Sequence, residues 1–449
     1  MDSRNTRNTR NSRKNNKRKR SSSKSQSSPT DKQPHKKQAM LEELPYDVTV
    51  SILNDFEKTD LKTLNNVLGY YINNVSPEDY NAILKRIFNY PIQTLNSLLL
   101  DYSSRGYDNI LDVLLTKGAN VNAVNPQYFN ITALHIASER GNVNAIERLL
   151  RAPGVNVNIK DNRGYSPLHL AAMNDQGESI RTLITFPNID INIEDREENT
   201  ALHTAAFYNK AISIRSLLTA RGINVNKKNR DRKTPLHLAT YNNRVDSIRA
   251  LLTARGINLN KKDADGNTPL YYIARNCNED GIKLLLDHGA DINEPCNTGI
   301  IPLQGVILND ETSERIQIKC MELLLARGAN INHQDKGGWT ALHFAAEMCN
   351  PYILQFLVKK PGIILDLQTK NSKKTPLQYI QDKLTYQNMS RCQKCFRILS
   401  NPPGSSVKED SIGGATHTNY KGRNYKIQSG QAGGRYILVG ADKKKIYLK

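Results

Sequence analysis

A six-residue motif that returns about every 34 residues constrains this chain more than any other feature. The motif is TALHIA at Thr132, and related hexapeptides begin at Ser166, Thr200, Thr234, Thr268, Ile301, Thr340 and Thr375. Successive starts are 34, 34, 34, 34, 33, 39 and 35 residues apart. A period of this length is typical of units that cannot bury their apolar faces alone and therefore stack on their neighbours. We expect one repeat array to occupy most of the 449 residues.

Each unit carries the signals of two short helices. Thr or Ser followed by Pro or Ala is typical of a helix start, because the hydroxyl caps the first turn and Pro fits the position after it. Apolar residues then recur at helical spacing, as in Leu134, Ala137 and Ile146. A glycine ends the second helix, as in RGIN at 221–224. Buried leucines such as Leu217 are predicted to hold neighbouring units together.

These features resemble the ankyrin repeat over about residues 91–400. The resemblance implies a mainly α fold: a solenoid of about nine helix-turn-helix units, the first and last of them degenerate. It also implies that a target protein binds the hairpin tips between units and the first helices on the concave side. The candidate target-binding residues at the tips are Arg163, Glu197, Arg230, Arg232, Asp265, Lys336, Trp339 and Lys373.

The tips differ in charge from one another. The segment 194–199 is acidic, whereas 227–233 and 369–374 are basic. Mixed charges favour one specific protein surface over a uniform polyanion. The 39-residue step reflects about six extra residues around 309–314, which form either a tolerated surface loop or an added contact.

Five histidines recur at the same place in the motif, a full repeat apart. That separation is too large for them to converge on one ion, so a catalytic or metal-binding role is disfavoured. We predict buried imidazoles hydrogen-bonded to neighbouring backbone. The five are His135, His169, His203, His237 and His343.

The segment 39–90 has a different pattern from the repeats. Leu44 and Pro45 precede a short amphipathic helix, and a second helix begins after Asp60, a good N-cap. This resembles the F-box, which joins a substrate adaptor to the Skp-type subunit of a cullin ubiquitin ligase. The alternative is an N-terminal cap that shields the first repeat. The resemblance implies that the subunit contacts Leu44, Pro45, Ile52, Leu53, Leu61 and Leu64.

The net charge of +20 is concentrated at the two ends of the chain. Residues 1–38 contain 13 Lys or Arg against 2 Asp, and residues 418–449 contain 8 against 1. Partners chosen by charge should therefore meet the ends. Residues 1–38 nearly lack large apolar groups, so we expect a disordered tail. Its segment 13–20 is typical of a nuclear-import signal or a polyanion-binding arm, although a plain solvated tail has the same composition.

The C-terminal segment 418–449 follows a predicted linker at 401–417. Alternating residues around Tyr425, RYILV and KIYL predict a three-stranded β meander. It resembles the small basic adaptor domain of chlorella viruses and other large DNA viruses. A sheet this small is marginal alone, so we expect it to dock on nucleic acid or on a viral component. The candidate basic residues are Lys421, Arg423, Lys426, Arg435, Lys443, Lys444 and Lys445.

Six cysteines are scattered without a framework spacing, which fits reduced thiols in the cytosol or nucleus. Cys392 and Cys395 could share a metal, but no second pair completes a tetrahedral site, so we interpret them as ordinary thiols. The sequence shows no signal-peptide core and no apolar run long enough to span a membrane. We expect an intracellular protein, in the host cytoplasm and nucleus, that is not secreted.

No phosphate loop, catalytic triad or complete metal set is present, so we predict a non-enzymatic, monomeric adaptor without cofactors. In the leading hypothesis, a protein of a large DNA virus captures a target on its repeats and recruits a host Skp–cullin ligase. The alternative is a scaffold or tether anchored to nucleic acid or viral components by its basic ends, in which residues 39–90 act only as a cap.

Overall fold

The computed structural model describes residues 90–105, 108–386 and 390–402, together with the strands 417–420, 423–429, 435–439 and 444–448. The predicted tail and the F-box-like segment, including its six candidate contact residues, lie outside the described residues. Lys421 and Lys443 of the predicted basic site also lie outside them.

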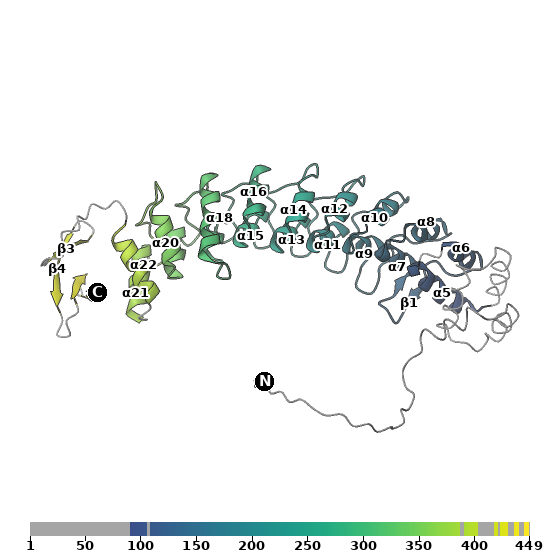
Figure 1. The fold of residues 1–449 in the computed structure, drawn as a ribbon, viewed down its shortest axis with the longest axis horizontal. Coiled ribbons are helices and arrows are strands. Elements are labelled where there is room, and N and C mark those ends of the chain that lie inside the picture. The colour runs from purple at the N-terminus through teal and green to yellow at the C-terminus, as the bar shows by residue number, and fades with distance from the viewer. Residues whose placement is uncertain are drawn as a thin grey trace, which may run out of the picture. The chain divides into compact units, whose positions relative to one another are not determined.

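The described chain contains eighteen helices. Consecutive helices pack in pairs, and each pair packs on the next, so that odd-numbered helices form one layer and even-numbered helices the other (Figure 1). The helices are α5 (Ile92–Arg105), α6 (Asp108–Thr116), α7 (Ala133–Arg140), α8 (Val143–Arg151), α9 (Pro167–Met173), α10 (Gly177–Ile184), α11 (Ala201–Phe207), α12 (Ala211–Leu217), α13 (Pro235–Tyr241), α14 (Val245–Leu251), α15 (Pro269–Arg275), α16 (Glu279–Asp287), α17 (Pro302–Ile307), α18 (Glu314–Ala326), α19 (Ala341–Glu347), α20 (Pro351–Val358), α21 (Pro376–Tyr386) and α22 (Ser390–Ser400).

The helix boundaries follow from the predicted caps. The hydroxyl of Thr234 accepts a hydrogen bond from the amide of His237, and Pro235 occupies the first helical position. This hydroxyl thereby satisfies one of the amide groups that a helix start leaves without an intrahelical partner. After the second helices, Gly222 and Gly256 adopt φ values of +83° and +74°, a left-handed conformation that glycine reaches without steric cost.

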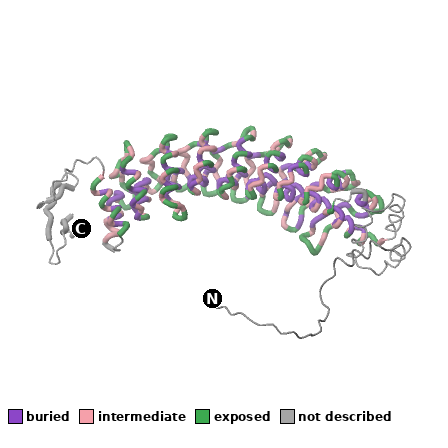
Figure 2. Tube along the Cα trace, viewed as in Figure 1, coloured by how far each residue is buried: buried purple, intermediate pink, exposed green. Residues whose placement is uncertain are grey.

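The core lies between the two helix layers and continues from one pair to the next. Leu217 and Leu251 are completely buried there, as predicted. In Figure 2 buried residues follow the helices of each pair, while the turns at both ends of the pairs are exposed. Each repeat therefore depends on its neighbours for burial, as expected of a repeat array.

The extra residues of the 39-residue step lie between α17 and α18, as the sequence indicated. The amide oxygen of Asn309 accepts hydrogen bonds from the backbone N–H groups of Glu311 and Thr312, at 3.0 and 2.7 Å. Its amide nitrogen donates to the carbonyl of Arg275, at 2.7 Å. The insertion is thus fastened to the neighbouring repeat.

The described strands form two antiparallel sheets. Strands β1 (Val124–Asn125) and β2 (Ile131–Thr132) flank one hairpin tip. The C-terminal meander has four strands in the order β3-β4-β5-β6, and not the predicted three. The added strand pairs with its neighbour although its sequence, HTNY, lacks the apolar alternation on which the prediction relied, and it begins inside the predicted linker. The four are β3 (His417–Tyr420), β4 (Arg423–Ser429), β5 (Arg435–Val439) and β6 (Lys444–Leu448).

One cysteine pair corrects the expectation of six reduced thiols. Cys349 and Cys392 form a disulfide, with Cα atoms 4.8 Å apart, and are 43 positions apart in sequence. The bond joins the turn after α19 to the last helix, because α22 packs on α20. Cys395 is a buried free thiol, and burial raises its pKa to about 12. None of the described helices is long and apolar enough to cross a bilayer.

Candidate protein-interaction surface

The repeated histidines bind the repeats to one another. In each, Nδ1 accepts a hydrogen bond from the backbone amide of the helix-capping residue, as at Thr234 and His237, 3.1 Å apart. Nε2 lies within hydrogen-bond distance of a backbone carbonyl in the following repeat. Because a carbonyl can only accept, Nε2 carries the proton and the imidazole is neutral. The five carbonyls belong to Tyr165, Asn199, Lys233, Asn267 and Lys374.

Burial governs the protonation of these side chains. All five imidazoles are fully buried, as the sequence predicted, and loss of solvation lowers their pKa values. For His135, His203 and His237 the pKa falls to about 4. Among the residues that the structure describes, no group of His, Cys, Asp or Glu side chains could hold a metal ion. The histidines are therefore neutral connectors between repeats near pH 7.

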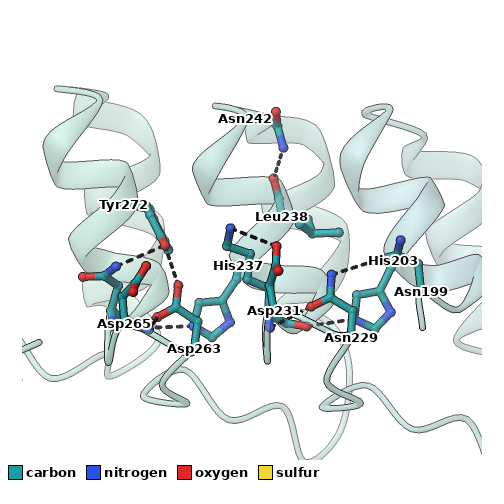
Figure 3. Close-up of polar contacts among 12 residues, drawn as sticks. Asn199, His203, Asn229, Asp231, His237, Leu238, Asn242, Asp263, Asp265 and Tyr272 are labelled. Atoms are coloured by element: carbon teal, nitrogen blue, oxygen red, sulfur yellow. Dashed lines mark hydrogen bonds and ion pairs between the residues drawn. The ribbon is translucent and has the colours of Figure 1, made fainter. Parts of the chain in front are cut away.

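In several hairpin tips the side chain at the start holds the tip backbone. The carboxylate of Asp263 accepts hydrogen bonds from the backbone amides of Asp265 and Asn267, at 3.0 and 2.9 Å, as Figure 3 shows in part. Asp195 does the same for Glu197 and Asn199, both at 2.8 Å. These bonds fix the tip backbone before any partner arrives, which reduces the entropy that binding would cost.

Backbone hydrogen bonds also join neighbouring tips. The amide of Arg230 donates to the carbonyl of Glu197 at 3.1 Å, and the amide of Ala264 donates to the carbonyl of Asp231 at 3.1 Å. Equivalent bonds link Asn162 to Phe129, Asn297 to Asp265, Lys336 to Thr298 and Lys370 to Gly337. We call these tips, which include the tip at 194–199, the tip row.

The eight predicted target-binding residues all lie on tips, but several already have partners. Glu197 forms an ion pair with Arg230 at 2.8 Å, so the acidic and basic tips that the sequence set apart partly neutralise each other. Arg163 pairs with Asp161 at 2.7 Å, and its guanidinium lies 4.5 Å from the ring centre of Phe129. The remaining charged ones are exposed: Arg232, Asp265, Lys336 and Lys373.

Trp339 is half-buried at its tip and does not stand free. Its ring centre lies 4.8 Å from that of Tyr379 and 5.4 Å from that of Phe344. The side-chain amide of Gln304 donates to the backbone carbonyl of Trp339, at 3.0 Å. The tryptophan therefore packs between repeats and offers a partner only part of its ring.

Three exposed aromatic residues in two neighbouring repeats were not singled out from the sequence, and one of them, Tyr241, lies against Lys233 of the tip row. Phe207, Tyr208 and Tyr241 are 39%, 43% and 53% exposed at the ends of α11 and α13. We call them the aromatic patch. Phe207 and Tyr241 hold the same position in consecutive repeats, 34 residues apart. This repetition is the sequence signal from which the patch could have been predicted. Exposed aromatic groups of this kind are enriched in protein interfaces.

Tyr272 packs against one ring of the aromatic patch, that of Tyr241. Its ring packs edge-on against Tyr241 with centres 5.2 Å apart. Its hydroxyl donates to the carboxylate of Asp263, as Figure 3 shows. Burial and this hydrogen bond raise the pKa of Tyr272 well above its usual range. The ammonium of Lys233 lies 4.9 Å from the ring centre of Tyr241, which adds a cation beside the exposed ring.

Five of the seven predicted C-terminal basic residues lie on the four-stranded sheet. Arg423 and Lys426 are on β4, Arg435 is on β5, and Lys444 and Lys445 are on β6. The backbone register pairs Lys445 with Leu438 and Lys444 with Val439.

Two family models match the chain. One, described as ankyrin repeats (3 copies), matches residues 99–195, 184–263 and 202–296. The other, described as ankyrin repeats (many copies), matches residues 314–358. Together they cover more than half of the chain.

Similar curated proteins match only short stretches. Alpha-latrotoxin-Lt1a of Latrodectus tredecimguttatus is 34% identical over 62 residues, which is 14% of this chain and 4% of the toxin. A probable serine/threonine-protein kinase of Dictyostelium discoideum is 39% identical over 70 residues, 16% of this chain and 8% of the kinase. The chain thus spans less than a tenth of either protein.

Two solved structures are also similar. The ankyrin repeat domain of Bcl-3 is 29% identical, with a TM-score of 0.43, over 47% of this chain and 92% of that one. The human ASB11 ankyrin repeat domain is 25% identical, with a TM-score of 0.42, over 52% of this chain and 98% of that one.

Proposed function

Because this chain belongs to the ankyrin-repeat proteins, we propose that it is a non-enzymatic adaptor that captures a target protein on the tip row and the aromatic patch. Ankyrin repeats form protein–protein interaction domains. We further propose which surface binds the target and what the captured protein is presented to. We also propose that the described helix pairs are the nine units that the sequence indicated.

The observation that carries the proposal is the aromatic patch beside a pre-ordered tip row. The rings of Phe207 and Tyr208 pack edge-on with centres 4.9 Å apart, so each restricts the other while both remain exposed. The guanidinium of Arg244 donates to the carbonyl of Phe207 at 3.1 Å, which links α11 to the turn before α14. Ordered aromatic groups lose little conformational entropy on binding and bury a large apolar area.

For the segment 39–90 we retain the ligase-recruiting role. Leu44, Pro45, Ile52, Leu53, Leu61 and Leu64 are proposed to contact the Skp-type subunit. Ubiquitin transfer to the captured protein would then be accelerated by raising its effective concentration near the ligase. The chemistry would be performed by other subunits of that ligase.

A tether is the second candidate function, and the four-stranded sheet supports it. Five basic residues fall on three neighbouring strands of one small sheet, and anchoring to a polyanion requires positive charge concentrated in a short segment. In this version, residues 39–90 only cap the array against Ser97 to Leu100. We also propose that the chain is of viral origin and that this sheet docks on nucleic acid or on a viral component.

Calorimetric titration of the full chain with a purified Skp–cullin fragment separates the two functions. Micromolar or tighter binding that is lost in Leu53→Asp/Leu61→Asp supports the ligase adaptor. The variant must keep the unfolding transition of the parent, so that loss of binding is not loss of folding. Absence of binding at high concentration leaves the tether, which predicts salt-dependent retention of the full chain on DNA.

Target capture is tested by comparing proteins that co-purify with the full chain and with two variants. Phe207→Ala/Tyr241→Ala removes two rings of the aromatic patch. Tyr352→Ala is the matched control, because Tyr352 is 54% exposed on α20, a helix of the other layer. We expect the patch variant alone to lose a specific partner. Equal retention by both variants would show that the patch does not capture the target.

A further inference from the structure

Two consecutive helices of the even-numbered layer, α12 and α14, and the turns after them carry exposed arginines that have no partner in the described chain. None of these side chains makes a hydrogen bond, an ion pair or a ring contact with another described residue. The two repeats contribute identical pairs, each in the sequence SIRxLLTARGIN. The four residues, which we call the arginine ridge, are Arg215, Arg221, Arg249 and Arg255.

The flanking repeats show that this lack of partners is local. Arg181 holds the position of Arg215 one repeat earlier, and it pairs with Glu178 and donates to the hydroxyl of Ser216 at 2.7 Å. Lys283 holds the position one repeat after Arg249, and it pairs with Glu279 at 2.5 Å. Of the four basic residues that hold this position in successive repeats, Arg181 and Lys283 are thus neutralised, whereas Arg215 and Arg249 between them remain charged.

The charge around the arginine ridge is one-sided. The segment 208–223 contains Lys210, Arg215 and Arg221 and no acidic residue. The segment 242–258 adds three arginines against one acid, Asp246, which already accepts a hydrogen bond from Asn209 at 3.2 Å. Like charges in such numbers repel one another, and an anionic ligand would relieve the repulsion.

We propose that the arginine ridge binds an acidic segment of a partner protein. The guanidinium fork donates two parallel hydrogen bonds to a carboxylate, a geometry that lysine does not offer. Packed helices lie about 8–10 Å apart, and an extended peptide advances about 3.3–3.6 Å per residue, so acidic residues three apart match arginines on α12 and α14. The occupant is not part of this chain's own ends, since both are strongly basic.

A short peptide fits the ridge better than nucleic acid does. Acidic residues border it on both sides: Glu178, paired with Arg181, lies before it, and Asp280 and Asp287, the latter paired with Arg327, lie after it. A long polyanion crossing the layer would leave the unpartnered arginines for these neutralised neighbours, whereas a peptide that spans two repeats would stay on the ridge. Ile212, 49% exposed and one helical turn before Arg215, also offers an apolar contact that a phosphate backbone cannot use.

The test uses the full chain and an eight-residue Asp/Glu-rich peptide containing one leucine, at physiological salt. Hydrogen–deuterium exchange locates the bound peptide, and a titration gives its affinity. The first variant is Arg215→Gln/Arg249→Gln. The control is Arg181→Gln/Lys283→Gln, which removes the same two charges from the same layer but at positions that are already paired. Both variants keep the basic ends, so the contribution of the ends cancels in the comparison.

We expect the peptide to slow exchange in α12 and α14, and the first variant to lose that protection with an affinity about tenfold weaker. The control should change affinity by less than about twofold. Equal weakening in both variants, or protection confined to the chain ends, would overturn the proposal. A DNA duplex that protects α12 and α14 as well as the peptide does would overturn the choice of partner. Because the ridge and the tip row lie on different segments, neither outcome bears on the proposed target capture.

Discussion

The Nε2 atom of His237 lies 3.1 Å from the backbone carbonyl of Asn267 in the next repeat. Its Nδ1 atom accepts the amide hydrogen of Thr234 in its own repeat, at 3.1 Å. One side chain therefore hydrogen-bonds both to the amide at the start of its own helix and to a backbone carbonyl of the neighbouring tip. In the repeat that begins at Ile301, glutamine takes the place of histidine: Gln304 accepts from the amide of Ile301 at 3.1 Å and donates to the carbonyl of His333 at 3.0 Å.

Replacing His237 by Leu should lower the free energy of unfolding by about 2–4 kcal/mol, because two buried backbone groups lose their partners. His237→Gln should cost much less, since an amide side chain can make both bonds. Urea denaturation of the two variants measures the difference. An equal loss in both would mean that shape, and not hydrogen bonding, accounts for the role of the imidazole.

Stability should fall as the pH drops from about 6.5 to about 4. The pKa values of His135, His203 and His237 are lowered to about 4 in the folded chain, whereas an unfolded histidine titrates near 6.5. In this window the unfolded state binds more protons, so acid favours unfolding, and one such histidine accounts for about 3 kcal/mol at most. Denaturation midpoints at several pH values test this. His203→Gln/His237→Gln should give a shallower dependence, and an unchanged slope would contradict the assignment.

Asp263 is expected to support both its tip and the aromatic patch. Asp263→Ala removes the acceptor of two backbone amides and of the Tyr272 hydroxyl, and should cost about 1–3 kcal/mol. Asp263→Asn should cost less, because Asn229 holds the preceding tip with an amide side chain. Combining Asp263→Ala with Tyr272→Phe should cost less than the sum of the single losses. Strict additivity would show that the two side chains do not act together.

Removing the Cys349–Cys392 disulfide should destabilise the last repeats. A cross-link across 43 residues lowers the entropy of the unfolded chain, worth about 4 kcal/mol in the chain-entropy model. Cys349→Ser and a reducing agent should therefore each lower the unfolding midpoint. The reducing agent should have no further effect on the Cys349→Ser variant. If reduction left the parent chain unchanged, the bond would not contribute to stability.

The sequence predicted what is local or repeated. The caps, the glycine turns, the buried histidines and the insertion at 309–314 depend on residues close together in the chain, and the structure confirms them. The pairing of Glu197 with Arg230 depends on how neighbouring tips stack, and composition alone showed only two tips of opposite charge. The disulfide needed the packing of α22 on α20, which no spacing of cysteines reveals.

The candidate site was predictable in its location more than in its residues. Tips could be placed from the period, so all eight predicted tip residues are where they were expected. The sequence could not show which of them remain free to contact a partner. Arg163 packs on Phe129 and Trp339 packs on Tyr379, both within the array. Exposed aromatic residues such as Tyr241 sit inside a helix motif that otherwise indicates burial, and only the folded packing shows that the ring faces outward.

The histidine connection has a consequence for how such a chain changes over generations. The hydrogen bond that each imidazole makes to the next repeat goes to a backbone carbonyl and not to a side chain. Any unit that places a carbonyl there can follow any unit that supplies the imidazole. Whole repeats can therefore be copied in frame without a compensating mutation in the adjacent repeat. The nearly identical segments SIRSLLTARGINVNKK and SIRALLTARGINLNKK show the mark that such a copying event would leave.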